Sequence, residues 1–295
     1  MEAHEWMVKS TYQTEWINRR GILLWLAMYA GGLGGGLYLV SLYFNDFSGM
    51  LISLLIVAGL KGGFHFAYLG KPWRFWRLFF RPQTSWLARG FIFVVLFTVF
   101  AAIQLVLSHR MPGTNWETVF KVLAGLMAFG LTIYTGFVLN SVKAVSFWNS
   151  PLLPVLFVMW GLLGGLGLVV LIALYGGNVD IHVAEKGSLW FMTMSTILFG
   201  VYLWTTLQRD ETGKTSVIEQ VTGRVAPIFW IGMILLGIAV PLTVAVFSFF
   251  SGEIVPAVLI LGVVCELIGG LSMRYCLLKV GIYKPLFARP SYLRP

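Results

Sequence analysis

The chain has 295 residues, of which 58% are hydrophobic and 11% are charged, with a formal net charge of +9 and a mean hydropathy of +0.82. Soluble domains carry about 25% charged residues, so this composition excludes a water-soluble protein and predicts one that lies in lipid. The two cysteines, Cys265 and Cys276, lie in one apolar segment, and the sequence has no CxxC or Cys/His zinc spacing. This usage excludes a cubane cluster, a zinc site and a disulfide framework.

A polar arm over residues 1–20 precedes the first apolar run. That run is long enough to span a membrane, so no cleavable signal peptide is expected. A spanning helix needs about 20 mostly apolar residues, and eight segments meet this requirement: 21–43, 48–70, 87–108, 118–142, 152–175, 187–207, 226–249 and 254–279. The runs do not alternate as the strands of a transmembrane barrel do. The sequence therefore predicts an all-α integral membrane protein with eight transmembrane helices, in two four-helix bundles over 21–142 and 143–279, with a tail over 280–295.

An even number of spans places both termini on the same side of the membrane. On that side lie 17 of the 21 Lys and Arg residues, with Arg274 counted as the start of the basic C-terminal end; three lie on the other side, and Lys61 lies within a span. Basic residues favour the cytoplasm, so both termini and the joint 71–89 are predicted to be cytoplasmic. Five tryptophans at the same level indicate an interfacial aromatic belt: Trp16, Trp73, Trp76, Trp86 and Trp148.

Two spans are rich in glycine. The first reads MYAGGLGGG over 28–36 and the fifth reads MWGLLGGLG over 159–167. Small residues four apart let helix backbones approach closely. The parallel placement indicates either a weak four-plus-four internal repeat or two independent occurrences of the same packing.

Polar side chains gather near the side of the termini. In the second span, Lys61, His65 and Tyr68 are spaced four and three residues apart, so they share one helix face. Tyr134 of the fourth span and Asn18, just before the first span, lie toward the same side. Ionisable groups inside spans are costly and indicate function. A neutral imidazole beside a phenol, with a lysine one turn deeper, can exchange protons with a quinone head group and hydrogen-bond its oxygens.

Each of these residues also has a purely structural explanation. His65 is explained equally well as a hydrogen-bond donor in helix packing, Tyr134 as a member of the aromatic belt, and Asn18 as the cap of the first helix. Glu266 lies in the middle of the last span, at a depth comparable with that of Lys61. Lys61 is too far from either end of its helix to reach water easily, so we expect it to pair with Glu266 in a proton path.

A haem held by two histidines needs both of them inside the bundle. His65 lies clearly within a span, whereas His4 belongs to the arm and His109 and His182 belong to the opposite surface. The sequence therefore predicts no haem and no metal ligands.

Two stretches resemble the NrfD-like family, the membrane anchors of polysulfide-reductase-type complexes. YLGKPWRFWRLFFRPQTSWLARG (68–90) resembles the family's loop after helix two, and YTGFVLNSVKAVSFWNSPLLPVLF (134–157) resembles its passage from helix four to helix five. The resemblance implies a prokaryotic inner-membrane subunit that binds menaquinone or ubiquinone without haem or cluster of its own. It also implies electron exchange with an iron–sulfur subunit, which serves a molybdopterin catalytic subunit; the subunit alone is not expected to catalyse a complete reaction.

The resemblance also implies roles for single residues. Tyr134 matches the tyrosine of the family's YTG motif. His65 and Tyr68 stand just before the leucine–glycine pair near which related anchors place a quinol-site histidine, shifted by about one helical turn. Asn18 fits a further polar contact loosely. His65 and Tyr134 are thus expected to act on the quinone, with Asn18 and Tyr68 among its binding residues.

The joint 65–90 is the most basic of the chain and is also aromatic. Topology and the aromatic belt alone explain this composition. The resemblance implies a second use, in which its cations steer and hold the iron–sulfur subunit by complementary charge. The residues expected to do so are Arg74, Arg77 and Arg81.

A secondary transporter is an alternative of a different class, and a proton-translocating subunit is a third. The four-plus-four pattern and the expected pair of Lys61 with Glu266 would then couple ions to transport. Transporters break helices at matching midplane points in both repeats, and the glycine-rich spans match that pattern only in part.

Overall fold

The computed structural model describes residues 9–177, 179–251 and 255–286; His4 and the outer parts of the predicted arm and tail lie outside these ranges. Within them, eight helical segments are long and apolar enough to cross a membrane: Gly21–Phe44, Phe47–Tyr68, Trp86–Arg110, Asn115–Ser141, Leu152–Leu174, Ile181–Leu207, Ile228–Ser248 and Pro256–Lys279. The prediction of an all-α integral membrane protein with eight spans is confirmed.

The elements follow one another in a simple order. They are the strand β1 (Thr11–Tyr12), α2 (Gly21–Phe44), α3 (Phe47–Leu55), the π-helix η1 (Ile56–Lys61), α4 (Gly62–Tyr68), the 3-10 helix η2 (Pro72–Phe80), α5 (Trp86–Arg110), α6 (Asn115–Ser141), α7 (Leu152–Leu174), α8 (Ile181–Leu207), α9 (Glu211–Val221), the π-helix η3 (Ile228–Ala239), α10 (Val240–Ser251), α11 (Pro256–Lys279) and the strand β2 (Ile282–Tyr283).

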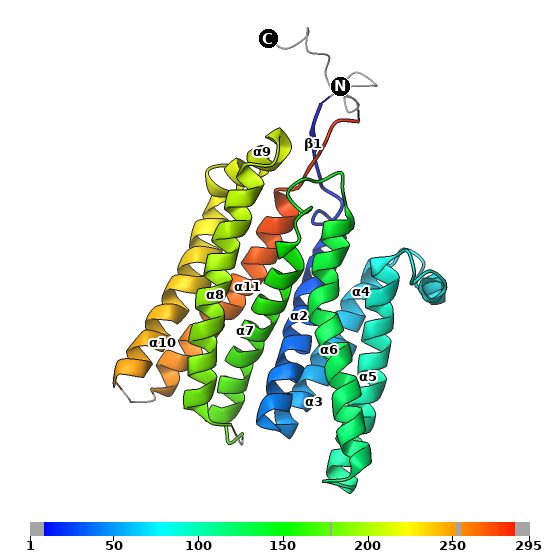
Figure 1. The fold of residues 1–295 in the computed structure, drawn as a ribbon, viewed down its shortest axis with the longest axis vertical. Helices are drawn as coiled ribbons and strands as arrows, with labels where there is room; N and C mark the ends of the chain where they lie inside the picture. The colour runs from blue at the N-terminus through cyan, green and yellow to red at the C-terminus, as the bar shows by residue number, and fades with distance from the viewer. Residues whose placement is uncertain (1–8, 178, 252–254, 287–295) are drawn as a thin grey trace.

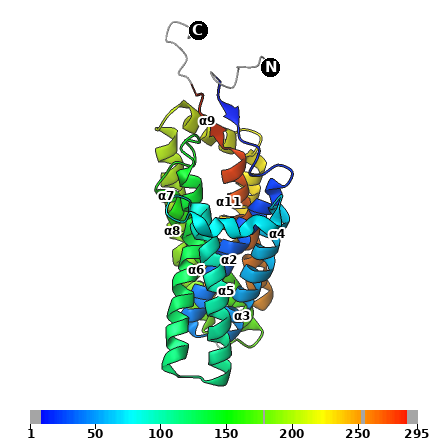
Figure 2. The same ribbon diagram turned by 90° about the vertical axis from the view of Figure 1, so that its right-hand side faces the viewer.

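The spans stand side by side, with α2 to α6 in one half and α7 to α11 in the other (Figure 1). Helix α2 joins the two halves. It packs against α3, η1, α4 and α6 of its own half and against α7 and α11 of the other. Both ends of the described chain lie at the same end of the molecule (Figures 1 and 2). We call this end the terminal end and the other the opposite end.

The glycines of the first and fifth spans face each other. A Cβ atom built at Gly36 of α2 would overlap the carbonyl oxygen of Gly161 on α7, and one built at Gly165 would lie 2.5 Å from the carbonyl carbon of Gly36. No side chain fits into such a space. The close approach expected from the small residues therefore occurs between these two helices, across the boundary between the two halves.

Two spans depart from the regular helices that the sequence predicts. In the second span, η1 contains Gly59 and is followed by Gly62 and Gly63, and glycine has a low helix propensity. In the seventh span, Pro241 follows η3 and has no N–H group for the helical hydrogen bond. Lys61 is the last residue of η1, so one departure lies at a buried charge; π segments are frequent at functional sites.

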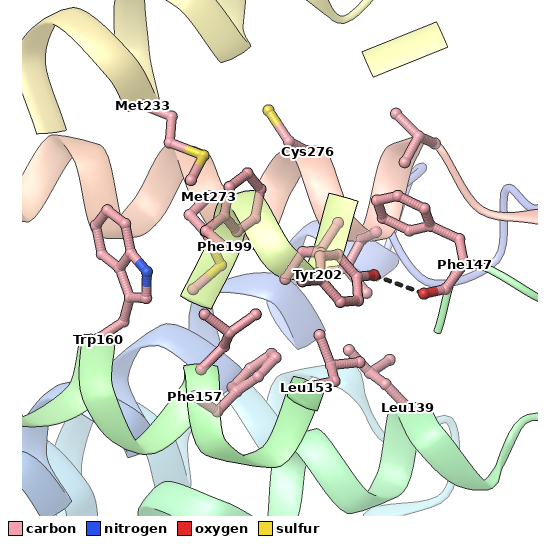
Figure 3. Packing of buried hydrophobic residues seen from close by; sticks show 14 of the residues in the cluster. Leu139, Phe147, Leu153, Phe157, Trp160, Phe199, Tyr202, Met233, Met273 and Cys276 are labelled. Atoms are coloured by element: carbon pink, nitrogen blue, oxygen red, sulfur yellow. Dashed lines mark hydrogen bonds between the residues drawn. The ribbon is translucent and has the colours of Figure 1, made fainter. Parts of the chain in front are cut away.

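The largest hydrophobic cluster lies near the terminal end, mostly in the second half, and also includes side chains of α2 and α6. Figure 3 shows Phe199 and Tyr202 of α8 packed among side chains of α7 and α11, with the Tyr202 hydroxyl donating to the Phe147 carbonyl at 2.5 Å. Trp148 belongs to the same cluster and is fully buried, and its Nε1 donates to the Leu277 carbonyl at 2.7 Å. Its assignment to an interfacial belt is therefore wrong, because the segment between α6 and α7 folds inward rather than along the membrane surface.

The terminal end carries an ordered polar surface. Strands β1 and β2 pair antiparallel, and Val145 between α6 and α7 bridges to Tyr283 of β2. Asp210, between α8 and α9, accepts hydrogen bonds from Ser146 at 2.7 Å and from the Gly213 amide at 2.8 Å, and pairs with Lys284 at 3.0 Å. Burial alone would raise the pKa of Asp210, but these hydrogen bonds together lower it below its ordinary value. One carboxylate thus ties the α6–α7 segment, the α8–α9 corner and the C-terminal strand together.

Candidate functional site

Lys61 is the centre of a buried cluster between α2 and α6. Its side chain is 1% exposed, and its Nζ donates to the Tyr134 hydroxyl at 2.6 Å and to the Ala27 carbonyl at 3.4 Å. The ammonium also lies 4.9 Å from the centre of the Tyr134 ring. Gly31 of α2 makes room for it, because a Cβ atom there would lie 2.5 Å from Nζ. Hydrogen bonds and an aromatic face thus offset the cost of burying this charge.

Tyr134 is held from two sides. Its buried side chain lies on α6, seven residues before the helix ends at Ser141. Gly90 of α5 gives it room, because a Cβ atom there would overlap the ring. The Tyr134 oxygen accepts the hydrogen bond from Lys61, so the phenol retains its own proton for another acceptor. Burial and this fixed partner distinguish Tyr134 from a belt residue.

His65 lies one turn nearer the terminal end than Lys61. Its Nδ1 is 3.2 Å from the Lys61 carbonyl oxygen, and the ring is half-buried. A carbonyl can only accept, so Nδ1 carries the proton in this contact, and Nε2 of the neutral ring is left as an acceptor. The structure therefore brings Lys61, Tyr134 and His65 into one connected group, with a phenol donor and an imidazole acceptor at its edge.

Among the described residues, no hydrogen bond joins the other two predicted quinone-binding residues to this group. Tyr68, at the end of α4 and three residues beyond His65, is half-buried against the largest hydrophobic cluster, which also includes Leu24 and Met28 of α2. Asn18 is exposed, and its Oδ1 accepts a hydrogen bond from Lys279 at 2.8 Å. The explanation of Asn18 as a helix cap is wrong, because the N-cap residue of α2 is Arg20 and no side chain bonds there.

Lys61 and Glu266 do not form a direct pair in the described part of the protein. Glu266 of α11 is 5% exposed, its Oε1 lies against Gly167 of α7, and this oxygen has no hydrogen-bond partner in the described part of the protein. Lys61 instead faces α6, and α2 stands between the two sites. Equal depth along the helices was the basis of the prediction, and depth does not fix the lateral position of a side chain.

Arg274 is a buried cation, although its position in the sequence assigned it to the basic C-terminal end. It is 2% exposed; its Nη1 donates to the Gly270 carbonyl at 2.9 Å, and its guanidinium carbon lies 5.3 Å from the ring centres of Tyr29 and Phe157. Gly32 of α2 makes room for this guanidinium, because a Cβ atom there would lie 2.5 Å from Nη2. A sequence signal for this burial was available. Glu266, Gly270 and Arg274 are spaced by four, which puts both charged side chains on one helix face with a glycine between them.

Glu266 borders two cavities. One of about 10 Å³ also contacts Tyr29, Trp160 and Arg274. The other, of about 40 Å³, lies between α7, α8, α10 and α11 and is also lined by Glu185, whose Oε1 accepts a hydrogen bond from Ser248 at 2.7 Å. A water molecule needs about 10–15 Å³ of such volume and polar partners, and the second cavity meets both conditions. Glu185 was not predicted from the sequence.

The three arginines expected to dock a partner lie on or next to η2. Arg74 and Arg77 belong to this helix, Arg81 follows it, and all three side chains are exposed. The helix η2 lies beyond the end of α4, on the outer side of the first half (Figure 1).

Comparison with known sequences identifies the relationship. The profile of the family described as "Polysulphide reductase, NrfD" matches residues 18–285, which is nearly the whole chain. The chain belongs to this family. Among relatives of the NrfD-family chain, "Protein NrfD" of Escherichia coli is 27% identical over 248 residues, covering 72% of this chain and 76% of that one. "Protein NrfD homolog" of Haemophilus influenzae is 25% identical over 242 residues, covering 72% and 75%.

A third relative of the NrfD-family protein has a more informative name. It is the C chain of the polysulfide reductase of Wolinella succinogenes, 26% identical over 167 residues, covering 55% of this protein and 53% of that one. The name makes that relative one chain of a reductase with several chains. The match covers about half the length of either protein.

Proposed function

We propose that this protein is the quinone- or quinol-binding membrane anchor of a respiratory oxidoreductase complex. It exchanges electrons between the membrane quinone pool and an attached iron–sulfur subunit, which serves a molybdopterin catalytic subunit. Membership of the NrfD family supports an anchor role, and the name of the Wolinella succinogenes relative supports assembly with other chains.

The observation that carries the proposal is the group of Lys61, Tyr134 and His65. A quinone has two carbonyl oxygens that accept hydrogen bonds, and when bound it supplies the two-electron, two-proton chemistry. The Tyr134 hydroxyl, whose oxygen is held by Lys61 at 2.6 Å, directs its proton away from that lysine. His65 offers Nε2 as an acceptor, because its Nδ1 faces the Lys61 carbonyl. Lys61 thereby orients the donor through its side chain and the acceptor through its backbone.

The sidedness of the protein follows from charge. With Arg274 buried, 16 Lys and Arg residues remain on the side of the termini against three on the other side. We therefore place the terminal end in the cytoplasm of a prokaryotic cell and the spans in its inner membrane. The iron–sulfur partner then docks on the ordered surface of β1, β2 and α9, at the end of the molecule toward which α4 and α6 run (Figure 1).

The test is quinol turnover by the purified complex in lipid, with His65→Ala and Tyr134→Phe as the variants. Loss of a positioned acid or base costs about 10²–10⁴-fold in rate, so each variant should turn over at least about 10²-fold more slowly while the subunits stay together. His109→Ala and Tyr43→Phe are matched controls, because both residues are exposed at the opposite end. Unchanged turnover in both test variants would overturn the proposal.

A further inference from the structure

The helix η2 is built as three distinct rows. A 3-10 helix has three residues per turn, so side chains three apart stand in line. Over Pro72–Phe80 this gives an inner row, a tryptophan row and an arginine row. The inner row is Pro72, Phe75 and Leu78; the tryptophan row is Trp73, Trp76 and Phe79; the arginine row is Arg74, Arg77 and Phe80.

The inner row fastens η2 to the outer side of the first half. Phe75 contacts Phe66 of α4 and Phe91 of α5, with ring centres 5.6 Å and 5.8 Å apart. Phe79 also reaches Phe91, at 4.8 Å. Figure 2 shows this segment, drawn in cyan after α4, running across the bundle rather than along it. Because α4 ends and α5 begins beside it, η2 lies at the level where the second span ends and the third begins.

The other two rows face outward. Trp73 is 87% exposed, and Trp76, Phe79 and Phe80 are also exposed. Phe66 of α4 and Leu87 of α5, in the spans before and after η2, are also exposed apolar side chains. Tryptophan favours the boundary between head groups and acyl chains, where its ring is in an apolar medium and its N–H reaches polar groups.

The charge beside this row has one sign. Between Asp46 and Glu117 the sequence has no acidic residue, whereas it has seven Lys or Arg residues. Within the described residues, no carboxylate forms an ion pair with Arg74 or Arg77, and Arg77 lies 5.6 Å from the Trp76 ring. Arginine binds phosphate in a bidentate manner. A basic row next to an aromatic row on one short helix is complementary to an anionic membrane surface.

We infer that η2 is a membrane-surface helix that binds anionic phospholipid. Its tryptophan row lies among the acyl chains just below the head groups, and Arg74 and Arg77 contact the lipid phosphates. This assigns the arginines to lipid rather than to a protein partner. It is independent of the quinone site and holds whether or not that site is correct.

The test uses an environment-sensitive fluorophore on Trp73→Cys, in the intact complex reconstituted in lipid. The native cysteines Cys265 and Cys276 are buried, so labelling is directed to position 73. We expect quenching by lipids that carry a quencher near the head group and little quenching by aqueous iodide. Trp190→Cys, exposed on the membrane-spanning part of α8, is the lipid control, and Arg110→Cys, exposed where α5 ends at the opposite end, is the water control.

The remaining outcomes contradict the inference. Quenching by iodide would place η2 in water, and shielding from both quenchers would show that a protein partner covers it.

Lipid selectivity is measured with the quencher on phosphatidylglycerol or on phosphatidylcholine at equal mole fraction. Each Arg near an anionic surface favours that lipid about fivefold, so phosphatidylglycerol should quench more strongly, and Arg74→Gln with Arg77→Gln should remove the difference. If the two lipids quench the labelled protein equally while Arg74 and Arg77 are still present, the anionic preference is refuted. This result does not depend on whether the arginine variant assembles.

Discussion

The hydrogen bond between Lys61 and Tyr134 predicts a large energetic coupling between the two residues. Tyr134→Phe keeps the ring, its contact with Gly90 and its position under the ammonium, and removes only the hydroxyl at 2.6 Å. The buried Nζ would then keep the longer contact to the Ala27 carbonyl at 3.4 Å. A hydrogen bond to a charged group contributes about 1.5–3 kcal/mol, so Tyr134→Phe should lower the free energy of unfolding by about 2 kcal/mol.

Lys61→Met removes the charge and the bond together at similar volume. Replacing both partners by apolar groups of similar shape is much less costly than leaving one unpaired, so the double variant should lose less stability than the sum of the single variants. The expected coupling is about 1.5–3 kcal/mol. It is measured by reversible unfolding in mixed micelles, followed by circular dichroism.

A second double-mutant cycle, on a different pair of residues, provides the control. Lys61→Met combined with Glu266→Gln should give a smaller coupling than the first cycle, because the structure places α2 between these residues and no bond joins them. Losses for Lys61 and Tyr134 that add to within about 0.5 kcal/mol would refute the hydrogen bond as a source of stability. A larger coupling to Glu266 than to Tyr134 would show that the charges are paired differently.

Three further predictions address other parts of the fold. Gly36→Ala should lower the free energy of unfolding by about 1–3 kcal/mol, because α2 and α7 must separate, whereas Gly200→Ala, with open space around its Cβ position, should be neutral or slightly stabilising in the same unfolding assay. Asp210 has a lowered pKa in the folded protein, so its stabilisation is present above the ordinary carboxyl pKa of about 4 and is lost as the pH falls toward the folded value; the difference in melting temperature between wild type and Asp210→Asn should therefore shrink in acid. Arg274→Gln should lower the melting temperature without changing the side on which a C-terminal reporter lies; inverted topology would contradict its assignment as a packing residue.

The sequence predicts the number and place of the spans well, because a membrane-spanning helix has a length and composition that can be read directly. The ends are less well predicted where polar residues form caps. Helix α8 begins at Ile181 rather than 187, because Asp180 accepts from the amides of His182 and Val183. Helix α6 begins at Asn115 rather than 118, after the cap Thr114. A hydropathy pattern omits such polar first turns.

The candidate site could be predicted only in part. Helix spacing and depth were enough to select Lys61, His65 and Tyr134, which the structure joins. The same reasoning failed for the partner of Lys61, because depth leaves open which helix a side chain faces. Arg274 was missed because its distance of five residues from the helix end assigned it to the surface, while its spacing from Glu266, which puts both on one helix face, was not used.

The two adjacent glycines of α2 have an evolutionary consequence. Gly31 lies against the ammonium of Lys61, and Gly32 lies against the guanidinium of Arg274. Neither position can gain a side chain unless the cation opposite it becomes shorter or moves. Among descendants of a common ancestor, positions 31 and 61 should therefore change together, and so should positions 32 and 274, while each pair varies independently of the other.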